Sequence, residues 1–106
     1  ENEGLTLTIC VNYGGRDEIV RAARKIVAKG NEITEDTISS SLDYPGLPDV
    51  DLVIRTGGHQ RLSNFLTWQA TYAELYFTDI KWPAFDEAEL TKAVEWFAEQ
   101  KRNAGK

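Results

Sequence analysis

The sequence contains a single cysteine, Cys10, and a single histidine, His59, among its 106 residues. One cysteine cannot form a disulfide within the chain, as is typical of proteins in reducing compartments. One histidine with no second histidine or cysteine nearby makes a poor zinc site. The chain opens with no secretory signal pattern, and no window approaches a membrane-spanning helix, which takes roughly 18 apolar residues. These absences lead us to expect a cytoplasmic location.

Positive charge is also scarce. Twelve lysines and arginines stand against seventeen aspartates and glutamates, for a net charge of −5. Proteins that bind duplex nucleic acid usually carry a basic face, so this balance argues against a nucleic-acid partner. A small anionic ligand stays compatible with it, because such a ligand needs only a few cations in one pocket. Apolar residues are abundant, at 42%, which is enough for the packed core of one domain.

The first half of the chain carries three patterns of secondary structure. Residues 5–11 alternate apolar and polar side chains, which predicts a strand with one apolar face. Residues 17–29 carry apolar side chains at helical spacing and predict a helix that stops at Gly30. A second, shorter helix is expected from Thr34 to about Leu42. The predicted order is strand, helix, helix.

The second half is predicted to add further strands and helices. Residues 52–54 are wholly apolar, as in a strand covered on both faces of a parallel sheet. A helix is expected within residues 63–73, and a short strand is one interpretation of residues 75–78. Asp86 as N-cap, with Glu89 three residues later, predicts the last helix. The order predicts an α/β fold with part of a parallel sheet flanked by helices. Two or three strands fall short of a typical sheet, so we expect part of a larger domain.

Two loops follow the predicted strands, and each contains a glycine pair and an arginine. The first is NYGGR, residues 12–16, and the second is RTGGHQR, residues 55–61. Ligands of open α/β sheets bind at the carboxyl ends of strands, where glycines let the backbone come close. For the first loop, an ordinary turn with a surface arginine is the favoured interpretation, because such short motifs are weak signals.

Arg55, Arg61 and the hydroxyl of Ser63 are the candidate binding residues. Guanidinium groups pair with phosphate oxygens, and a helix opening at Ser63 would add free backbone amides, so we predict that the three surround a diphosphate. Arg55 abuts a buried strand and needs an anionic partner, for which an internal carboxylate such as Glu74 could serve as well as a ligand. Neither G-x-x-x-x-G-K-[ST] nor G-x-G-x-x-G occurs, so the usual nucleotide-binding loops are absent.

A long stretch of the chain resembles a known family. The stretch is DLVIRTGGHQRLSNFLTWQATYAELYFTDIKWPAFDE, residues 51–87, with NYGGRDEIVRA, residues 12–22, upstream. It closely resembles the C-terminal part of the cis-prenyltransferases and, among them, the bacterial undecaprenyl diphosphate synthases. The resemblance implies a homodimeric transferase with Mg2+ as cofactor. Such an enzyme condenses isopentenyl diphosphate repeatedly onto farnesyl diphosphate, giving a long-chain cis-polyprenyl diphosphate for the lipid carrier of cell-wall synthesis.

The resemblance also implies roles for individual residues. The family's arginines and serine that match Arg55, Arg61 and Ser63 bind isopentenyl diphosphate. The glutamate that matches Glu74 lies near the subunit interface and helps with the metal-diphosphate site. The family usually has glutamate where this chain has His59. The family's catalytic aspartate lies in an H-x-x-x-D-G-N-x-R-W-A motif that has no match here, so we expect no catalytic residue in this chain.

We therefore expect residues 1–106 to be the C-terminal portion of a single cis-prenyltransferase domain, with the N-terminal half absent. The chain would supply the isopentenyl diphosphate site and the dimer interface, and it would be inactive alone. Peripheral membrane contact through the lipid product is part of the same expectation. Two alternatives stay open: a non-catalytic partner subunit of a heteromeric cis-prenyltransferase, and an unrelated anion-binding α/β module.

Overall fold

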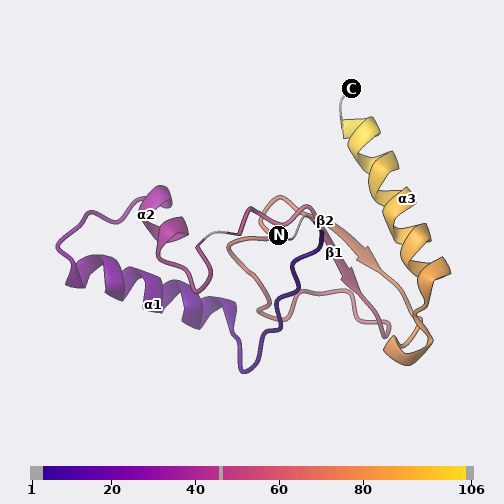
Figure 1. The fold of residues 1–106 in the computed structure, drawn as a ribbon, viewed down its shortest axis with the longest axis horizontal. Helices are drawn as coiled ribbons and strands as arrows, with labels where there is room; N and C mark the ends of the chain where they lie inside the picture. The colour runs from indigo at the N-terminus through magenta and orange to yellow at the C-terminus, as the bar shows by residue number, and fades with distance from the viewer. Residues whose placement is uncertain (1–3, 46, 105–106) are drawn as a thin grey trace.

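The computed structural model describes residues 4–45 and 47–104. The elements are helix α1 (Gly15–Ala28), helix α2 (Glu35–Ser40), strand β1 (Leu52–Arg55), strand β2 (Glu74–Phe77), the 3-10 helix η1 (Trp82–Ala84) and helix α3 (Glu87–Ala104). Figure 1 shows α1 and α2 at one end of the molecule, α3 at the other, and the two strands between them. The Cα radius of gyration is 16.3 Å, against about 13 Å for a compact domain of this length. The arrangement is therefore an open one.

The two strands form a parallel pair. Leu52 lies opposite Glu74, and Arg55 lies opposite Phe77. All four residues of β1 are half-buried, and the first three of them are apolar. The short strand that was one interpretation of residues 75–78 is present as β2. An α/β fold with a parallel sheet and helices is thus confirmed.

The helices at the two ends also agree with the sequence pattern. α1 is followed by Gly30 at φ 75°, the left-handed conformation that glycine adopts readily after a helix. Thr34 caps α2, with its hydroxyl accepting from the Thr37 amide at 3.1 Å. Asp86 precedes α3, and its Oδ1 accepts from the Glu89 amide at 3.1 Å. Among the described residues, no helix is both long and apolar enough to cross a bilayer.

The hydrophobic core of the molecule is small. Its main cluster lies between α1 and the region of α2, and it consists of Ala22, Ile26, Ile38 and Leu42. Trp68 packs against this cluster from the second half of the chain. At the other end, α3 packs against β2, where the rings of Tyr76 and Trp96 lie 5.3 Å apart. The strand pair and its pocket therefore lie between two separate regions of packing.

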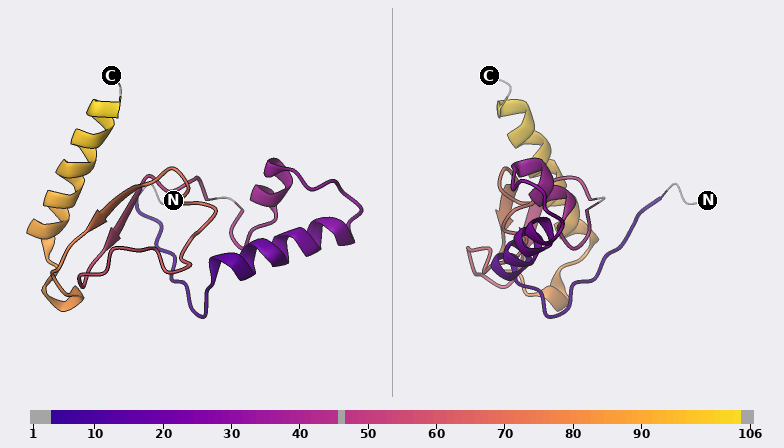
Figure 2. Two further views of the ribbon diagram at one scale, coloured as in Figure 1. Left: turned by 180° about the vertical axis from the view of Figure 1, so that it is seen from behind. Right: turned by 90° about the vertical axis from the view of Figure 1, so that its left-hand side faces the viewer.

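The prediction of a strand over residues 5–11 is wrong. The segment has no regular structure, and its apolar side chains at residues 5, 7, 9 and 11 are between 75% and 92% exposed. The right-hand view of Figure 2 shows this segment running out beside the rest of the molecule. A strand needs a neighbour for its backbone hydrogen bonds, and no other described part of the chain pairs with it. The alternation therefore marks an apolar face that is uncovered in this structure.

The helix expected within residues 63–73 is also wrong, because this region is a series of turns. Ser63, Asn64 and Leu66 have φ values of 53°, 69° and 50°. These left-handed conformations cannot continue a right-handed helix. The apolar spacing does not mark a buried helix face, since Phe65 is 41% and Tyr72 is 87% exposed.

Candidate diphosphate-binding site

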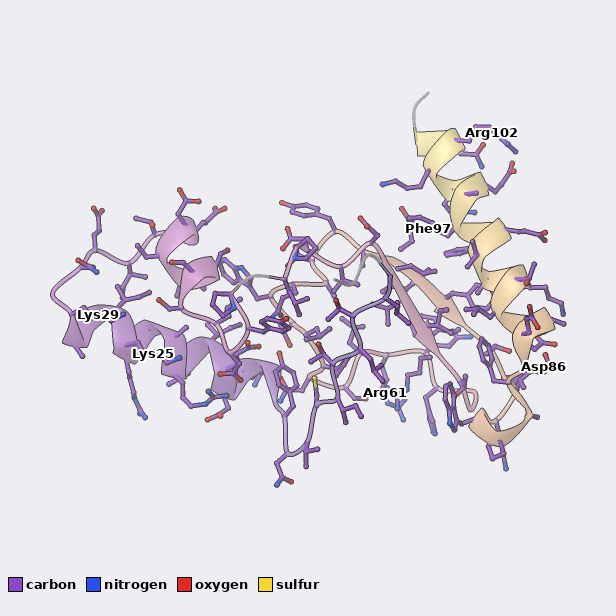
Figure 3. All side chains as sticks on the ribbon, in the orientation of Figure 1. Lys25, Lys29, Arg61, Asp86, Phe97 and Arg102 are labelled. Atoms are coloured by element: carbon purple, nitrogen blue, oxygen red, sulfur yellow. The ribbon has the colours of Figure 1, made fainter. Side chains whose placement is uncertain are left out.

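A pocket at the carboxyl end of β1 contains the three predicted binding residues. Arg55 is the last residue of β1, Arg61 and Ser63 follow in the turns, and all three line a cavity of about 340 Å³. The rest of the wall is apolar and is formed by Val53, Ile54, Leu62 and Phe65. Figure 3 shows Arg61 in the central part of the molecule, between the two helical ends. The pocket thus combines two cations with an apolar wall.

Neutral groups hold the guanidinium of Arg55. Its Nη1 donates to Ser63 Oγ at 2.8 Å and to the backbone carbonyl of Arg61 at 2.5 Å. The alternative in which Glu74 serves as the partner of Arg55 is therefore wrong. Within residues 4–45 and 47–104, neither Arg55 nor Arg61 forms an ion pair with a carboxylate. Their positive charges are oriented but not neutralised, as an anion site requires.

His59 contacts the second arginine of the pocket. Arg61 Nη2 lies 3.1 Å from His59 Nδ1. Because a guanidinium can only donate, Nδ1 accepts this bond, and the proton of the neutral ring is assigned to Nε2. His59 thus helps to orient Arg61 in the structure.

The glycine pair beside the pocket has a conformational role. Gly57 and Gly58 have φ values of 91° and 88°, which residues with a Cβ rarely adopt. Their amides donate to the carbonyls of Ile80 and Thr78, both at 3.0 Å. These two amides are therefore not free to bind a ligand. The free helix amides expected at Ser63 do not occur either, because Ser63 lies in a left-handed turn. A ligand in this pocket would therefore be held by side chains rather than by these backbone amides.

The first glycine loop leads into α1 and has no arginine in the pocket. The Gly15 amide donates to the backbone carbonyl of Asn64 at 2.7 Å, and the Arg16 amide donates to Asn64 Oδ1 at 2.9 Å. These first-turn amides of α1 are the groups that a ligand would otherwise use. Since Asn64 already occupies them, the geometry supports the structural interpretation of this loop.

Glu18 is a buried carboxylate that the sequence patterns did not single out, and it is only 2% exposed. It accepts hydrogen bonds from the hydroxyl of Tyr13, from Gln69 Nε2 at 3.2 and 3.3 Å, and from the Asp43 amide at 2.9 Å. Burial raises the pKa of Tyr13, and the bond to Glu18 raises it further.

The signal for a buried Glu18 was its helical register. It precedes Ala22 by four residues and Ile26 by eight, so it lies on the buried side of α1. Its contacts join α1 to the segment before it, to the loop after α2 and to the turns that follow the pocket.

The structure does not bring Glu74 to the pocket. Glu74 begins β2 opposite Leu52, at the far end of the strand pair from Arg55, a separation of roughly 10 Å at about 3.3 Å per residue. Among the described residues, no group of three or more histidine, cysteine, aspartate or glutamate side chains could hold a metal ion. One carboxylate does not make a magnesium site, so the metal role of Glu74 stays a prediction from the resemblance.

Fold and pocket together define an α/β protein with a pocket that contains two arginines at the carboxyl end of a strand. Residues 1–105 match the family model described as putative undecaprenyl diphosphate synthase, and the chain belongs to that family. The resemblance found in the motifs is therefore confirmed.

Individual relatives agree with this assignment. The chain is 55% identical to an isoprenyl transferase of Neisseria gonorrhoeae, over 99% of its own length and 43% of the relative's. It is 48% identical to the ditrans,polycis-undecaprenyl-diphosphate synthase ((2E,6E)-farnesyl-diphosphate specific) of Aliivibrio fischeri, over 99% of its own length and 44% of the relative's.

A solved structure matches as well. The crystal structure of a probable undecaprenyl diphosphate synthase from Campylobacter jejuni is 42% identical, with a TM-score of 0.79 over 91% of this chain and 45% of that chain. The chain thus spans less than half the length of these relatives, and its place along their length stays a prediction.

Proposed function

We propose that this chain supplies the isopentenyl diphosphate site of a cis-prenyltransferase, which adds isopentenyl units to farnesyl diphosphate to build a long-chain cis-polyprenyl diphosphate. The observation that carries the proposal is the convergence of Arg55, Arg61 and Ser63 on one pocket. Guanidinium forks match phosphate oxygens in geometry and charge. Family membership supports a prenyl diphosphate as the ligand.

Within the part of the chain that the structure describes, the contacts of the two arginines leave donors for a ligand. Nη1 of Arg55 is occupied by Ser63 Oγ and a carbonyl, so Nε and Nη2 remain for phosphate oxygens. Arg61 uses Nη2 toward His59 and retains Nε and Nη1. The apolar residues on the other wall suit a short isoprenoid tail. One pocket thus offers a charged side for the diphosphate and an apolar side for the hydrocarbon.

Farnesyl diphosphate, Mg2+ and a second copy of the chain complete the proposed enzyme, as the family resemblance implies. Mg2+ would neutralise diphosphate charge and so favour departure of the leaving group. The role of this chain's own residues is to bind and orient the attacking substrate. The expectation that the 106 residues are inactive alone follows from that division of roles, and it stays a prediction.

The proposal is tested by removing each arginine in the complete synthase. Arg55→Ala and Arg61→Ala should each weaken isopentenyl diphosphate binding by roughly 1.5 to 3 kcal/mol per lost charge-assisted hydrogen bond. The KM for farnesyl diphosphate should change far less. Lys29→Ala is the matched control, because it removes an exposed positive charge next to the end of α1. An unchanged KM for isopentenyl diphosphate in both arginine variants would refute the assignment.

A further inference from the structure

Asn64, in the turn that follows the second glycine loop, is hydrogen-bonded to the first glycine loop, although 48 residues separate it from Arg16. Its backbone carbonyl accepts from the Gly15 amide, and its side-chain Oδ1 accepts from the Arg16 amide. Both amides lie in the first turn of α1, where no preceding helical carbonyl can satisfy them. The residue at the N-cap position, Gly14, makes no side-chain cap. Asn64 therefore caps α1 from a distant part of the chain.

The same residue lies in the turn that carries Ser63. Ser63 and Asn64 both have left-handed backbone, with φ values of 53° and 69°. Asparagine tolerates this conformation, whereas it is unfavourable for serine. Contacts outside the turn must therefore stabilise this backbone conformation. The two hydrogen bonds from α1 to Asn64 are such contacts. Because Ser63 Oγ accepts from Arg55 at 2.8 Å, the position of this turn also sets the contact inside the pocket.

The first loop is shaped to accept this turn. A Cβ placed on Gly14 would lie 3.0 Å from Asn64 Nδ2, and one placed on Gly15 would lie 2.8 Å from the Cβ of Thr67. Side chains at these positions would push the turn away from α1. The close contact thus depends on the glycines of the first loop as well as on Asn64.

We propose that Asn64 is a positioning residue of the diphosphate site. By capping α1 it holds the turn at Ser63, and Ser63 in turn holds the guanidinium of Arg55. Asn64 itself does not line the pocket and needs no contact with the ligand. The inference rests on the proposed function and extends it, since it gives the first glycine loop a role as the support on which the second loop is placed.

Two substitutions in the complete synthase test this role. Asn64→Gly keeps the left-handed backbone accessible and removes only the side-chain cap, whereas Asn64→Asp keeps an oxygen acceptor at the same place. We expect Asn64→Gly to raise the KM for isopentenyl diphosphate roughly fivefold to tenfold, the effect of losing about one hydrogen bond. The KM for farnesyl diphosphate should stay nearly constant, and Asn64→Asp should restore the behaviour of the original chain.

The outcomes separate this inference from the proposed function when Arg55→Ala is measured in parallel. A raised KM for isopentenyl diphosphate in Arg55→Ala but not in Asn64→Gly overturns the role of Asn64 and leaves the site assignment intact. An unchanged KM for isopentenyl diphosphate in both variants overturns the site assignment, and the role of Asn64 with it. Equal losses for both substrates in Asn64→Gly would show a merely structural residue. If Asn64→Gly does not fold, the milder substitution Asn64→Ser replaces it. A KM that rises for isopentenyl diphosphate and not for farnesyl diphosphate then supports the role of Asn64, and an unchanged KM overturns it.

Discussion

The loops over residues 12–16 and 55–61 each place a glycine pair beside an arginine, but their glycines meet different physical needs. Gly15 is buried in the first turn of α1, and a Cβ there would collide with Thr67. Gly57 has open space around it and a φ of 91°. A glycine pair can therefore signal either close packing or a left-handed turn. Of the two loops, the second is the one whose own arginines line the pocket described above.

The largest effect is expected from Gly15→Ala. The new methyl group would lie 2.8 Å from Thr67 Cβ and 2.9 Å from its backbone nitrogen, so backbone must shift. We expect a loss of about 3 kcal/mol in the free energy of unfolding, at the upper end of overpacking costs, measured by urea denaturation. Adding Thr67→Ala should recover only part of the loss, because the backbone contact remains. A wild-type denaturation midpoint for Gly15→Ala alone would show that the loops do not approach this closely.

Gly57→Ala should cost less, about 1 to 2 kcal/mol, because the strain is conformational rather than steric. Apart from Gly57 and its two chain neighbours, no heavy atom of the described residues lies within 4 Å of the position where its Cβ would be. Gly57→Asn is the matched control, since asparagine adopts left-handed backbone more readily than alanine. Thermal or urea unfolding of both variants measures the difference. Equal destabilisation by alanine and asparagine would contradict a conformational role.

The smallest effect concerns pH and the hydrogen bond from Tyr13, in the first loop, to Glu18. The pKa of Tyr13 is raised by burial and by the bond to Glu18, so folding favours the protonated phenol. The resulting stabilisation is complete below the pKa of an unfolded tyrosine, about 10, and is lost as pH rises toward the higher folded-state pKa. The free energy of unfolding should therefore fall above pH about 10 in the original chain and less in Tyr13→Phe. If the free energy of unfolding falls equally above pH about 10 in both proteins, Tyr13 does not cause the loss.

Much of the structure followed from local sequence. Asp86 and Thr34 cap helices through their own side chains, and Gly30 ends α1 because its backbone permits it. Arg55, Arg61 and Ser63 could also be singled out together, because all three lie within residues 55–63. These features depend on neighbours in sequence, so they could be predicted.

The features that could not be predicted depend on distant contacts. The turn at Ser63 and Asn64 is left-handed because α1 binds it from across the sequence, and local spacing alone suggested a helix there. Residues 5–11 alternate like a strand, but strand formation depends on a partner that the described chain does not provide. The helical register of Glu18 places it on the buried side of α1, but its bond with Gln69, 51 residues away, could not be predicted from local sequence.

The bond from the Arg16 amide to Asn64 also has a consequence for the order of folding. It spans 48 residues, and the bond from Gln69 to Glu18 spans 51. Helices α1 and α3 can form from local contacts within about a microsecond, whereas contacts across such spans must first overcome the entropy of loop closure. Non-local contacts of this kind slow folding. The pocket turn should therefore acquire its final shape late, after the helix that supports it already exists.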